Sequence, residues 1–294
     1  MMLSISWFVA LAVLALAMLL LGRRFGSCRS SVQNAALIVS VVAVGLAAML
    51  RFRPVLLHHW LPLEISVWLD GLVSVFPWMF MVGVLSTGET TVQLRRSAPL
   101  MVVLGVVYFL FGGIWMLLPT IQIGAPEEIS PSGIIIQNRH DTCVPASAAN
   151  ALRMMGIPAT EQHMCEVVMA KPTRGSSIAR AAYGLRDYLR QHDMRVRLLD
   201  VSAAEAADRA TQKRPALIII RSGLMADHMV VLLGRTARGE VLIANPSPGV
   251  HGGIPALPTL IGYGLEVYSE EDFARLYRRG AVVFEDLIPP LASG

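Results

Sequence analysis

The chain is poor in charged residues. Charged side chains make up 16% of its 294 residues, whereas hydrophobic residues make up 54%. An ordinary soluble domain has roughly 25% charged residues, and disordered chains combine high net charge with low hydrophobicity. This composition excludes a disordered or fibrous chain, and it indicates that part of the protein lies in an apolar environment.

Lysine and cysteine are also scarce. The sequence has two lysines, Lys171 and Lys213, and neither follows a glycine. A phosphate-binding loop requires Gly-Lys-Ser/Thr, so ATP hydrolysis by such a loop is excluded within this chain, and we expect no nucleotide partner. Three cysteines in a chain of this length exclude a small disulfide-stapled fold.

The positive charge is confined to one half of the sequence. Residues 1–120 carry seven arginines against three acidic residues, whereas residues 121–294 carry 18 basic and 18 acidic side chains. The pI of 9.2 therefore reflects basic loops in a hydrophobic half and not a nucleic-acid-binding surface. We expect a lipid bilayer, and no nucleic acid, as a partner.

Four uncharged segments are long enough to cross a bilayer, which requires about 20 apolar residues. They are residues 1–21, 31–50, 71–88 (beginning near residue 65) and 97–123. The first is interpreted as a retained helix, because no basic residue precedes it, as a cleaved signal would require. The sequence predicts four transmembrane helices in residues 1–120, a linker at 121–132, and a second domain at 133–294.

The arginines between these segments predict an orientation. Loops one and three carry five of them and loop two carries two; the residues are Arg23, Arg24, Arg29, Arg95 and Arg96 against Arg51 and Arg53. Since basic loops stay in the cytoplasm, both ends of the chain are predicted to lie outside it. The prediction is an integral protein of a bacterial inner membrane with an extracytoplasmic second domain.

Neither acidic nor histidine residues in the hydrophobic half indicate a reaction centre. Asp70 is interpreted as an interfacial residue at a helix end, the alternative being an ion or proton relay. The adjacent His58 and His59 point in different directions and have no further ligand at metal-binding spacing. We expect no metal and no cofactor.

The second half predicts an α+β domain, because helical patterns come first and strand patterns follow. The order differs from the alternating pattern of a doubly wound sheet. Helices are predicted at residues 145–155, 161–170, 176–191, 203–212 and 270–278, and strands at 195–201, 216–221, 228–235, 240–245 and 281–285. Residues 250–263 are rich in Gly and Pro and predict a loop.

A candidate nucleophile begins the first of these helices. Cys143 precedes a helical run in which Pro145 suits the first turn. Free N–H groups and the helix dipole at this position favour a thiolate, so we expect a lowered pKa. The helix is dense in alanine, which predicts another element packed closely against it.

Such a nucleophile also needs a base, a residue that orients the base, and an oxyanion donor. Candidates for the first two follow Cys143 in the chain, and a candidate for the third precedes it. His228 opens an apolar strand and Asn245 ends the next one, with a turn at 234–239 between them. A hairpin would place Asn245 beside His228, where its side-chain oxygen can hold the imidazole N–H. Gln137 lies six residues before Cys143, and its amide is predicted to donate to an oxyanion.

This order resembles papain-like cysteine peptidases, and most closely the bacteriocin-processing branch that removes leader peptides after a double glycine. The resemblance covers roughly residues 133–285, including His-Met-Val-Val-Leu from His228, Ala-Asn-Pro-Ser-Pro-Gly from Ala244, and Ser-Glu-Glu-Asp-Phe from Ser269. It implies Cys143 as nucleophile, His228 as base, Asn245 as orienting residue and Gln137 as oxyanion donor.

The sequence also departs from that branch. Val144 replaces the usual glycine after the cysteine, and Asn245-Pro246 replaces Asp-Pro. Asparagine is the orienting residue in papain itself, so the second change is compatible with the chemistry. In transporters of the branch the peptidase precedes the membrane domain and an ATPase follows, whereas here the order is inverted and no phosphate-binding loop is present.

Three functions fit these residues. The prediction is a membrane-anchored cysteine peptidase that cleaves membrane-proximal or exported polypeptides, with a membrane or secretion protein as a further partner. The alternatives are an inactive peptidase fold that binds peptides, and an acyltransferase with the same triad. Within the site, an alternative is that His140 or Asp141 takes the place of one member of the triad. A further alternative is a disulfide between Cys143 and Cys165 in an oxidising compartment, although we expect Cys165 to be buried.

Overall fold

The computed structural model describes residues 2–51, 54–69, 72–87, 92–222, 227–248 and 259–286. The chain divides into two compact units, which are described separately. The first unit comprises Met1–Leu57 and Ile65–Leu118, and the second comprises His58–Glu64 and Pro119–Gly294.

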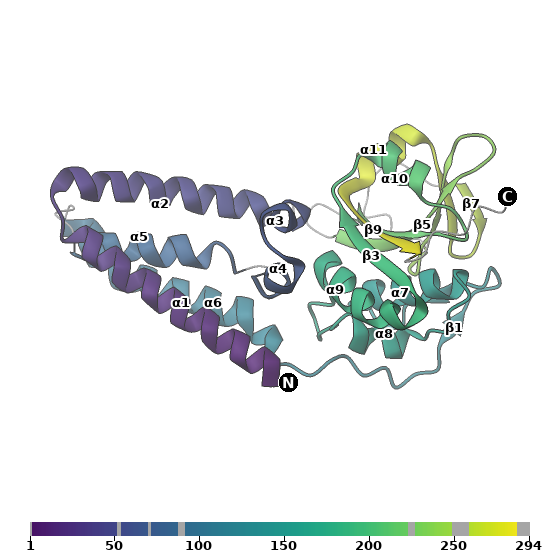
Figure 1. The fold of residues 1–294 in the computed structure, drawn as a ribbon, viewed down its shortest axis with the longest axis horizontal. Helices are drawn as coiled ribbons and strands as arrows, with labels where there is room; N and C mark the ends of the chain where they lie inside the picture. Colours follow the sequence, from purple (N-terminus) through teal and green to yellow (C-terminus); the bar gives the residue numbers. More distant parts are fainter. Residues whose placement is uncertain are drawn as a thin grey trace. The chain divides into compact units, whose positions relative to one another are not determined.

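The first unit is helical. Helices α1, α2, α5 and α6 run alongside one another (Figure 1), and three helical segments are long and apolar enough to cross a membrane: Ile5–Gly26, Ser30–Leu50 and Arg96–Met116. The helices are α1 (Met2–Gly26), α2 (Ser30–Arg51), α3 (Pro54–Trp60), α4 (Leu63–Leu69), α5 (Val75–Thr87), α6 (Val92–Gly113) and the short 3₁₀ helix η1 (Ile114–Met116).

The third predicted transmembrane segment is not one continuous helix. Its described part consists of the end of α4, a turn at residues 72–74, and α5. The 13 residues of α5 extend about 20 Å at 1.5 Å per residue, which is shorter than the ~30 Å hydrocarbon core. The described residues thus contain three long spans, and the fourth predicted span is not shown. Asp70 and Arg53, which entered the predictions above, lie outside the described residues.

Helix α5 is apolar all round and is the buried member of this unit. A Cβ added at Gly22 of α1 would overlap the carbonyl oxygen of Phe80, and one added at Gly83 of α5 would overlap that of Leu19. Glycines therefore allow the two backbones to touch, as small residues do at helix contacts in membranes. The hydrophobicity of α5 is therefore explained by its burial against the other helices of this unit.

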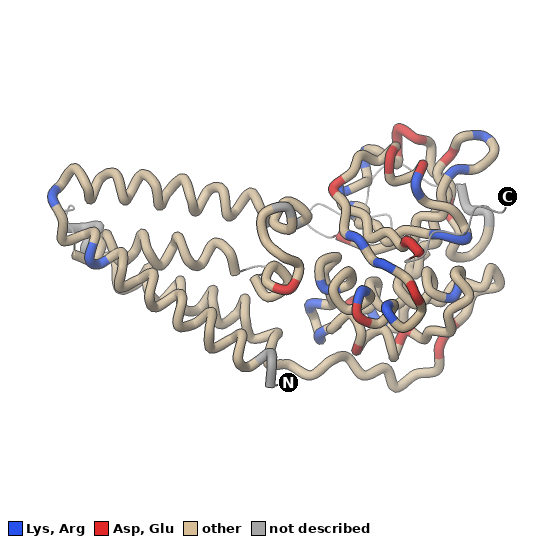
Figure 2. The backbone as a smooth tube through the Cα atoms, in the orientation of Figure 1, with Lys and Arg blue, Asp and Glu red and all other residues tan. Residues whose placement is uncertain are grey.

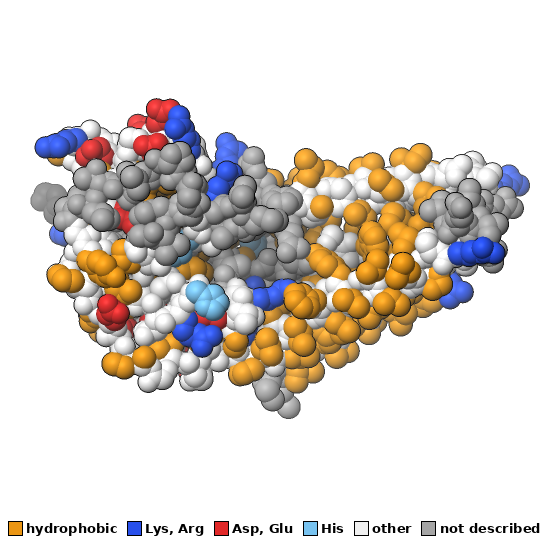
Figure 3. Space-filling view, turned by 180° about the vertical axis from the view of Figure 1, so that it is seen from behind, with side chains coloured by type: hydrophobic (Ala, Val, Ile, Leu, Met, Phe, Trp, Pro, Cys, Tyr) orange, Lys and Arg blue, Asp and Glu red, His pale blue; other side chains and the backbone are white. Residues whose placement is uncertain are grey.

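The outer faces of α1, α2 and α6 remain apolar and exposed. Val13, Ile38 and Phe111 are 61%, 65% and 72% exposed, and apolar side chains cover these helices in Figure 3. Charged residues gather instead on the second unit (Figure 2), while Arg23 and Arg24 lie in the last turn of α1. Exposed apolar faces of this extent are typical of contact with lipid.

The second unit is an α+β domain built on a seven-stranded antiparallel sheet with strand order β3-β9-β4-β5-β6-β8-β7. The predicted class is confirmed. The strands are β3 (Met194–Leu199), β4 (Ala216–Arg221), β5 (Asp227–Arg235), β6 (Val241–Ala244), β7 (Thr259–Gly262), β8 (Leu265–Tyr268) and β9 (Tyr277–Asp286), and a separate pair is formed by β1 (Glu128–Ile129) and β2 (Ile135–Ile136).

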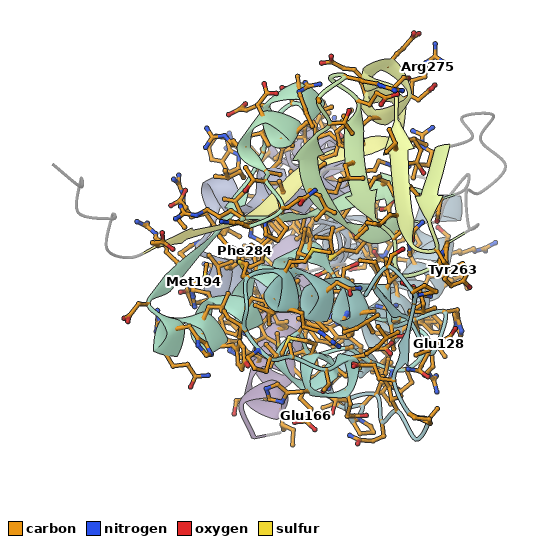
Figure 4. The ribbon with its side chains drawn as sticks, turned by 90° about the vertical axis from the view of Figure 1, so that its right-hand side faces the viewer. Glu128, Glu166, Met194, Tyr263, Arg275 and Phe284 are labelled. Carbon is orange, nitrogen blue, oxygen red and sulfur yellow. The ribbon has the colours of Figure 1, made fainter. Side chains whose placement is uncertain are left out.

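Helices cover both faces of this sheet. In Figure 4 the sheet lies between the helix that carries Glu166 and the helix that carries Arg275. Alternate residues of β5 show the same division, because Val231 packs in the core with α7, α8 and α9, while Val230 packs in the core with α10 and α11. The helices are α7 (Cys143–Met154), α8 (Glu161–Val167), α9 (Ile178–Leu189), the 3₁₀ helix η2 (Arg190–His192), α10 (Ala203–Arg209) and α11 (Glu270–Leu276).

Two segments differ from the prediction. Residues 121–132, expected to form a linker, are held by the second unit: Ile121 is buried and its N–H donates to the Ala170 carbonyl at 3.0 Å. Within the predicted loop 250–263, residues 259–262 form β7, and β8 follows where no strand was predicted. Both strands are short. The pairing of β8 with β6 and of β7 with β8 supplies hydrogen bonds that periodicity alone does not reveal.

One backbone contact in the second unit gives a stability prediction. Gly184 lies inside α9, and a Cβ there would overlap the Val167 carbonyl at the end of α8. Gly184→Ala should reduce the free energy of unfolding by about 1–3 kcal/mol through overpacking, although alanine favours a helix by up to about 1 kcal/mol. Urea-dependent alkylation of buried Cys165, with Cys28 and Cys143 replaced by serine, measures the change.

Gly124→Ala is the matched control, since no atom lies within 4 Å of a Cβ at that position. An unchanged or higher unfolding midpoint for Gly184→Ala would show that α8 and α9 are not in this close contact.

Candidate active site

Cys143 is the first residue of α7. Thr142 is the N-cap residue, and its N–H donates to the Arg139 carbonyl at 3.1 Å in the preceding turn. Pro145 lies in the first helical turn, where its missing N–H removes no helical hydrogen bond. The helix begins two residues earlier than predicted, so the cysteine sulfur lies among the free N–H groups of the helix end.

Helix α7 contacts the strand that carries His228. The N–H of Met229 is directed at the Cys143 sulfur, and the Ser147 hydroxyl, one helical turn later, donates to the Met229 carbonyl at 2.8 Å. Both polar groups of the Met229 backbone are thus turned toward α7, which fixes the position of the helix along β5. The close packing expected from the alanines is confirmed, because Ala146, Ala148, Ala149 and Ala151 are fully buried.

The expected lowering of the Cys143 pKa is wrong for this state of the protein. Loss of water around the sulfur raises the pKa above its ordinary value, and this outweighs the N–H groups of Met229, Val144 and Cys143, which act in the opposite direction. The negative charge of nearby Asp141 raises the pKa further. The resting cysteine is therefore a thiol, and forming a thiolate requires a base that accepts its proton.

The hairpin of β5 and β6 brings His228 and Asn245 together. The strands pair with Val231 opposite Ala244, and the turn between them contains Gly239 at φ +80°. His228 Nε2 and Asn245 Oδ1 are 2.8 Å apart, and both residues are buried. Because an amide oxygen only accepts hydrogen bonds, His228 carries its hydrogen on Nε2, and Nδ1 is the nitrogen without a hydrogen in the neutral ring.

Gln137 follows β2 in the loop that leads toward α7. Its backbone N–H donates to the Pro246 carbonyl at 2.9 Å, next to Asn245, and its side-chain Nε2 donates to the Arg139 carbonyl at 2.9 Å. The side-chain Oε1 is buried and, among the described residues, has no hydrogen-bond partner. The structure thus joins the Gln137 loop to the Asn245 turn, and its oxyanion role remains a prediction.

Buried polar residues that the sequence analysis missed hold this loop. The Asn150 side chain accepts from Ile135 N–H at 2.7 Å and donates to Ile135 carbonyl oxygen at 2.9 Å. Glu161, also buried, accepts from the Asn138 side chain at 2.7 Å. Each contact fixes the backbone on one side of Gln137. A polar residue in an otherwise alanine-rich helix, as Asn150 is, was the available sequence signal.

Glu266 is a further buried polar residue near the site that the sequence patterns did not predict. It lies on β8, is fully buried, and accepts a hydrogen bond from Asn245 Nδ2 at 2.9 Å. The Tyr268 hydroxyl donates to its other oxygen at 2.8 Å. A single acidic residue in the apolar strand Leu-Glu-Val-Tyr was the signal in the sequence, since buried acids require partners.

The alternative residues considered from the sequence have other roles. His140 is exposed. Burial would raise the pKa of Asp141, but hydrogen bonds from Arg139, at 2.9 Å, and from Thr173 N–H, at 2.8 Å, outweigh it and keep the pKa below its ordinary value. Asp141 is therefore a loop anchor.

All three cysteines are free thiols, and Cys165 is fully buried in α8 as expected. Burial raises the pKa of Cys165 to about 12. Within the described residues, no group of three or more His, Cys, Asp or Glu side chains is arranged to hold a metal ion. Cysteine and histidine, the residue types at the start of α7 and on β5, can serve as nucleophile and general base.

Comparisons with known proteins give distant structural matches. No family model and no curated protein matches the chain. The peptidase domain of Streptococcus ComA, described as a bifunctional ABC transporter involved in quorum sensing, is 15% identical with a TM-score of 0.40; the match covers 51% of this chain and 96% of that domain. The peptidase domain of Streptococcus mutans ComA is 14% identical with a TM-score of 0.34 and the same coverages.

The raised pKa of Cys143 gives a pH prediction. In His228→Ala the thiol should stay protonated through neutral pH, so that its alkylation by iodoacetamide rises only above the ordinary cysteine pKa of about 8.5. With His228 present, transfer of the proton to the imidazole should move the midpoint below that of His228→Ala. Alkylation rates between pH 5 and about 10 measure both midpoints.

Cys165 is the internal control, since its burial should keep it unlabelled over this range. Equal midpoints in the two proteins would mean that His228 does not receive the Cys143 proton.

Proposed function

We propose that the chain is a membrane-anchored cysteine peptidase that uses Cys143, His228 and Asn245 as its triad. The observation that carries the proposal is the 2.8 Å hydrogen bond between His228 Nε2 and Asn245 Oδ1. His228 lies on β5, and the backbone N–H of the next residue, Met229, is directed at the Cys143 sulfur. This arrangement supports a papain-like fold and chemistry, in agreement with the motif order in the sequence.

In the proposed reaction, Nδ1 of His228 accepts the proton of Cys143 and the thiolate attacks the scissile carbonyl carbon. The resulting oxyanion receives hydrogen bonds from the Cys143 backbone N–H, at the N-terminal end of α7, and from Gln137 Nε2. His228 then gives its proton to the leaving amine, which leaves an acyl-enzyme. Water, losing its proton to His228, hydrolyses the thioester and restores the thiol.

The membrane helices determine which substrates can reach this site. The three long apolar spans support an anchor in the bilayer, and the arginine distribution supports an extracytoplasmic peptidase domain at a bacterial inner membrane. Substrates are then polypeptides near the membrane or segments presented by a membrane or secretion protein. No metal, nucleotide or nucleic acid enters the proposed reaction.

Labelling with a fluorescent peptidyl vinyl sulfone tests the proposed chemistry, because the probe reacts with an activated cysteine next to a proton donor. Full-length protein in detergent should be labelled at Cys143 at neutral pH. Cys143→Ala should abolish labelling, and His228→Ala should slow it about 10²- to 10⁴-fold, the usual contribution of a general base.

Cys165→Ala is the matched control, because that thiol is buried and should not take part. Labelling at the rate of free cysteine, unaffected by His228→Ala, would leave a peptide-binding protein without peptidase activity.

The proposed orientation has a separate test. A C-terminal reporter that is active only in the cytoplasm should give no signal when fused to the full chain. The same reporter fused after residue 27, in the first basic loop, should be active, because basic loops are retained in the cytoplasm. An active C-terminal fusion would place the second unit on the cytoplasmic side.

A further inference from the structure

A buried carboxylate extends the hydrogen-bond chain that begins at His228. Asn245 follows β6, and its backbone N–H donates to the Gly264 carbonyl at 2.8 Å, just before β8. Ile243 pairs with Glu266, so Glu266 lies diagonally across from Asn245. The result is a continuous path from His228 through Asn245 and Glu266 to the Tyr268 hydroxyl.

The carboxylate determines which way the Asn245 amide faces. An ionised carboxylate only accepts hydrogen bonds, so Asn245 must present its nitrogen to Glu266, at 2.9 Å. Its oxygen then faces His228, and the same oxygen also accepts from Ser247 N–H at 2.8 Å. Two independent partners thus select one of the two amide orientations. That orientation keeps the hydrogen of His228 on Nε2, so that Nδ1 is the nitrogen without a hydrogen in the neutral ring.

We propose that Glu266 is a positioning residue of this site and supplies the negative charge that Asn245, as a neutral amide, does not. The inference rests on the proposed function, since its role appears when the Cys143 proton moves to Nδ1 of His228. The thiolate and imidazolium form together, and Nε2–H continues to donate to Asn245. The charge lies one residue further from the imidazole than it would with an aspartate at position 245.

Burial makes this charge effective. Glu266 and Asn245 are both fully buried, and the electrostatic effect of a charge is larger where water does not screen it. Tyr268 is also buried, and burial together with the charge of Glu266 raises its pKa, so that it remains a hydrogen-bond donor to the carboxylate. The carboxylate is thus held in place from the side opposite Asn245.

Exchanging the acidic and the amide side chain between positions 245 and 266 tests the proposal. Glu266→Gln keeps the shape but removes the charge; the rate of Cys143 alkylation by iodoacetamide at pH 7 should fall about tenfold or more, and the midpoint of its pH profile should move upward. Asn245→Asp should also be slow, because it places two carboxylates in contact. The double variant Asn245→Asp/Glu266→Gln should recover to within about threefold of the native rate, since the glutamine nitrogen can donate to the new aspartate.

Glu240→Gln is the matched control, because it removes one negative charge at the turn of the same hairpin, and it should leave rate and midpoint unchanged. Native rate and midpoint in Glu266→Gln, with His228→Ala still slow, would overturn the role of Glu266 and leave the proposed peptidase intact. A native protein whose alkylation is slow and independent of His228 would instead remove the peptidase and this role together.

Folding is followed in parallel by urea-dependent alkylation of Cys165. If Glu266→Gln or Asn245→Asp alone unfolds the domain, recovery of the folded state in the double variant supports the paired charge arrangement. A double variant that is as slow as either single variant, while folded, overturns it.

Discussion

The candidate site depends on one hydrogen bond, between His228 Nε2 and Asn245 Oδ1, and that bond depends on the register of the hairpin formed by β5 and β6. A shift of one residue in either strand would turn one of the two side chains to the opposite face of the sheet. Specific hydrogen bonds oppose such a shift, because the Ser147 hydroxyl donates to the Met229 carbonyl on β5 and the Asn245 N–H donates to the Gly264 carbonyl. Contacts with α7 and with the residues before β8 therefore hold the two side chains in place.

The side-chain polar groups of Asn245 and Glu266 are buried at little net cost because each has a hydrogen-bond partner. Asn245 uses its oxygen for His228 and Ser247 and its nitrogen for Glu266. Breaking such a network at one point leaves a buried group unsatisfied, which costs about 1–3 kcal/mol for a neutral group and more for a charge. This explains how a carboxylate can lie in the interior of the sheet.

Two features of its surroundings shift the pKa of Cys143 in opposite directions. The end of α7 supplies N–H groups that favour a thiolate, whereas removal of water favours the thiol and has the larger effect. Under the proposed mechanism the resting cysteine is an uncharged thiol, and the charged pair forms only when its proton moves to His228. A site of this kind is less exposed to oxidation than a permanent thiolate.

The first and second units differ in what their sequences reveal. Hydropathy identified the apolar segments, but it did not reveal that α5 is short and that it packs closely on α1 at Gly83. In the second unit, periodicity placed most helices and strands within a few residues. The short strands β7 and β8 were missed because they are stabilised mainly by pairing with neighbours.

The sequence by itself determined the two-part organisation, the α+β class, the helix that begins near Cys143, and the hairpin that pairs His228 with Asn245. These follow from local patterns of apolar, turn-forming and charged residues along the chain. Only the tertiary structure decided the raised pKa of Cys143 and the place of Glu266 behind Asn245. Both depend on burial and on contacts between segments distant in sequence, and no local pattern encodes how much water remains around an atom.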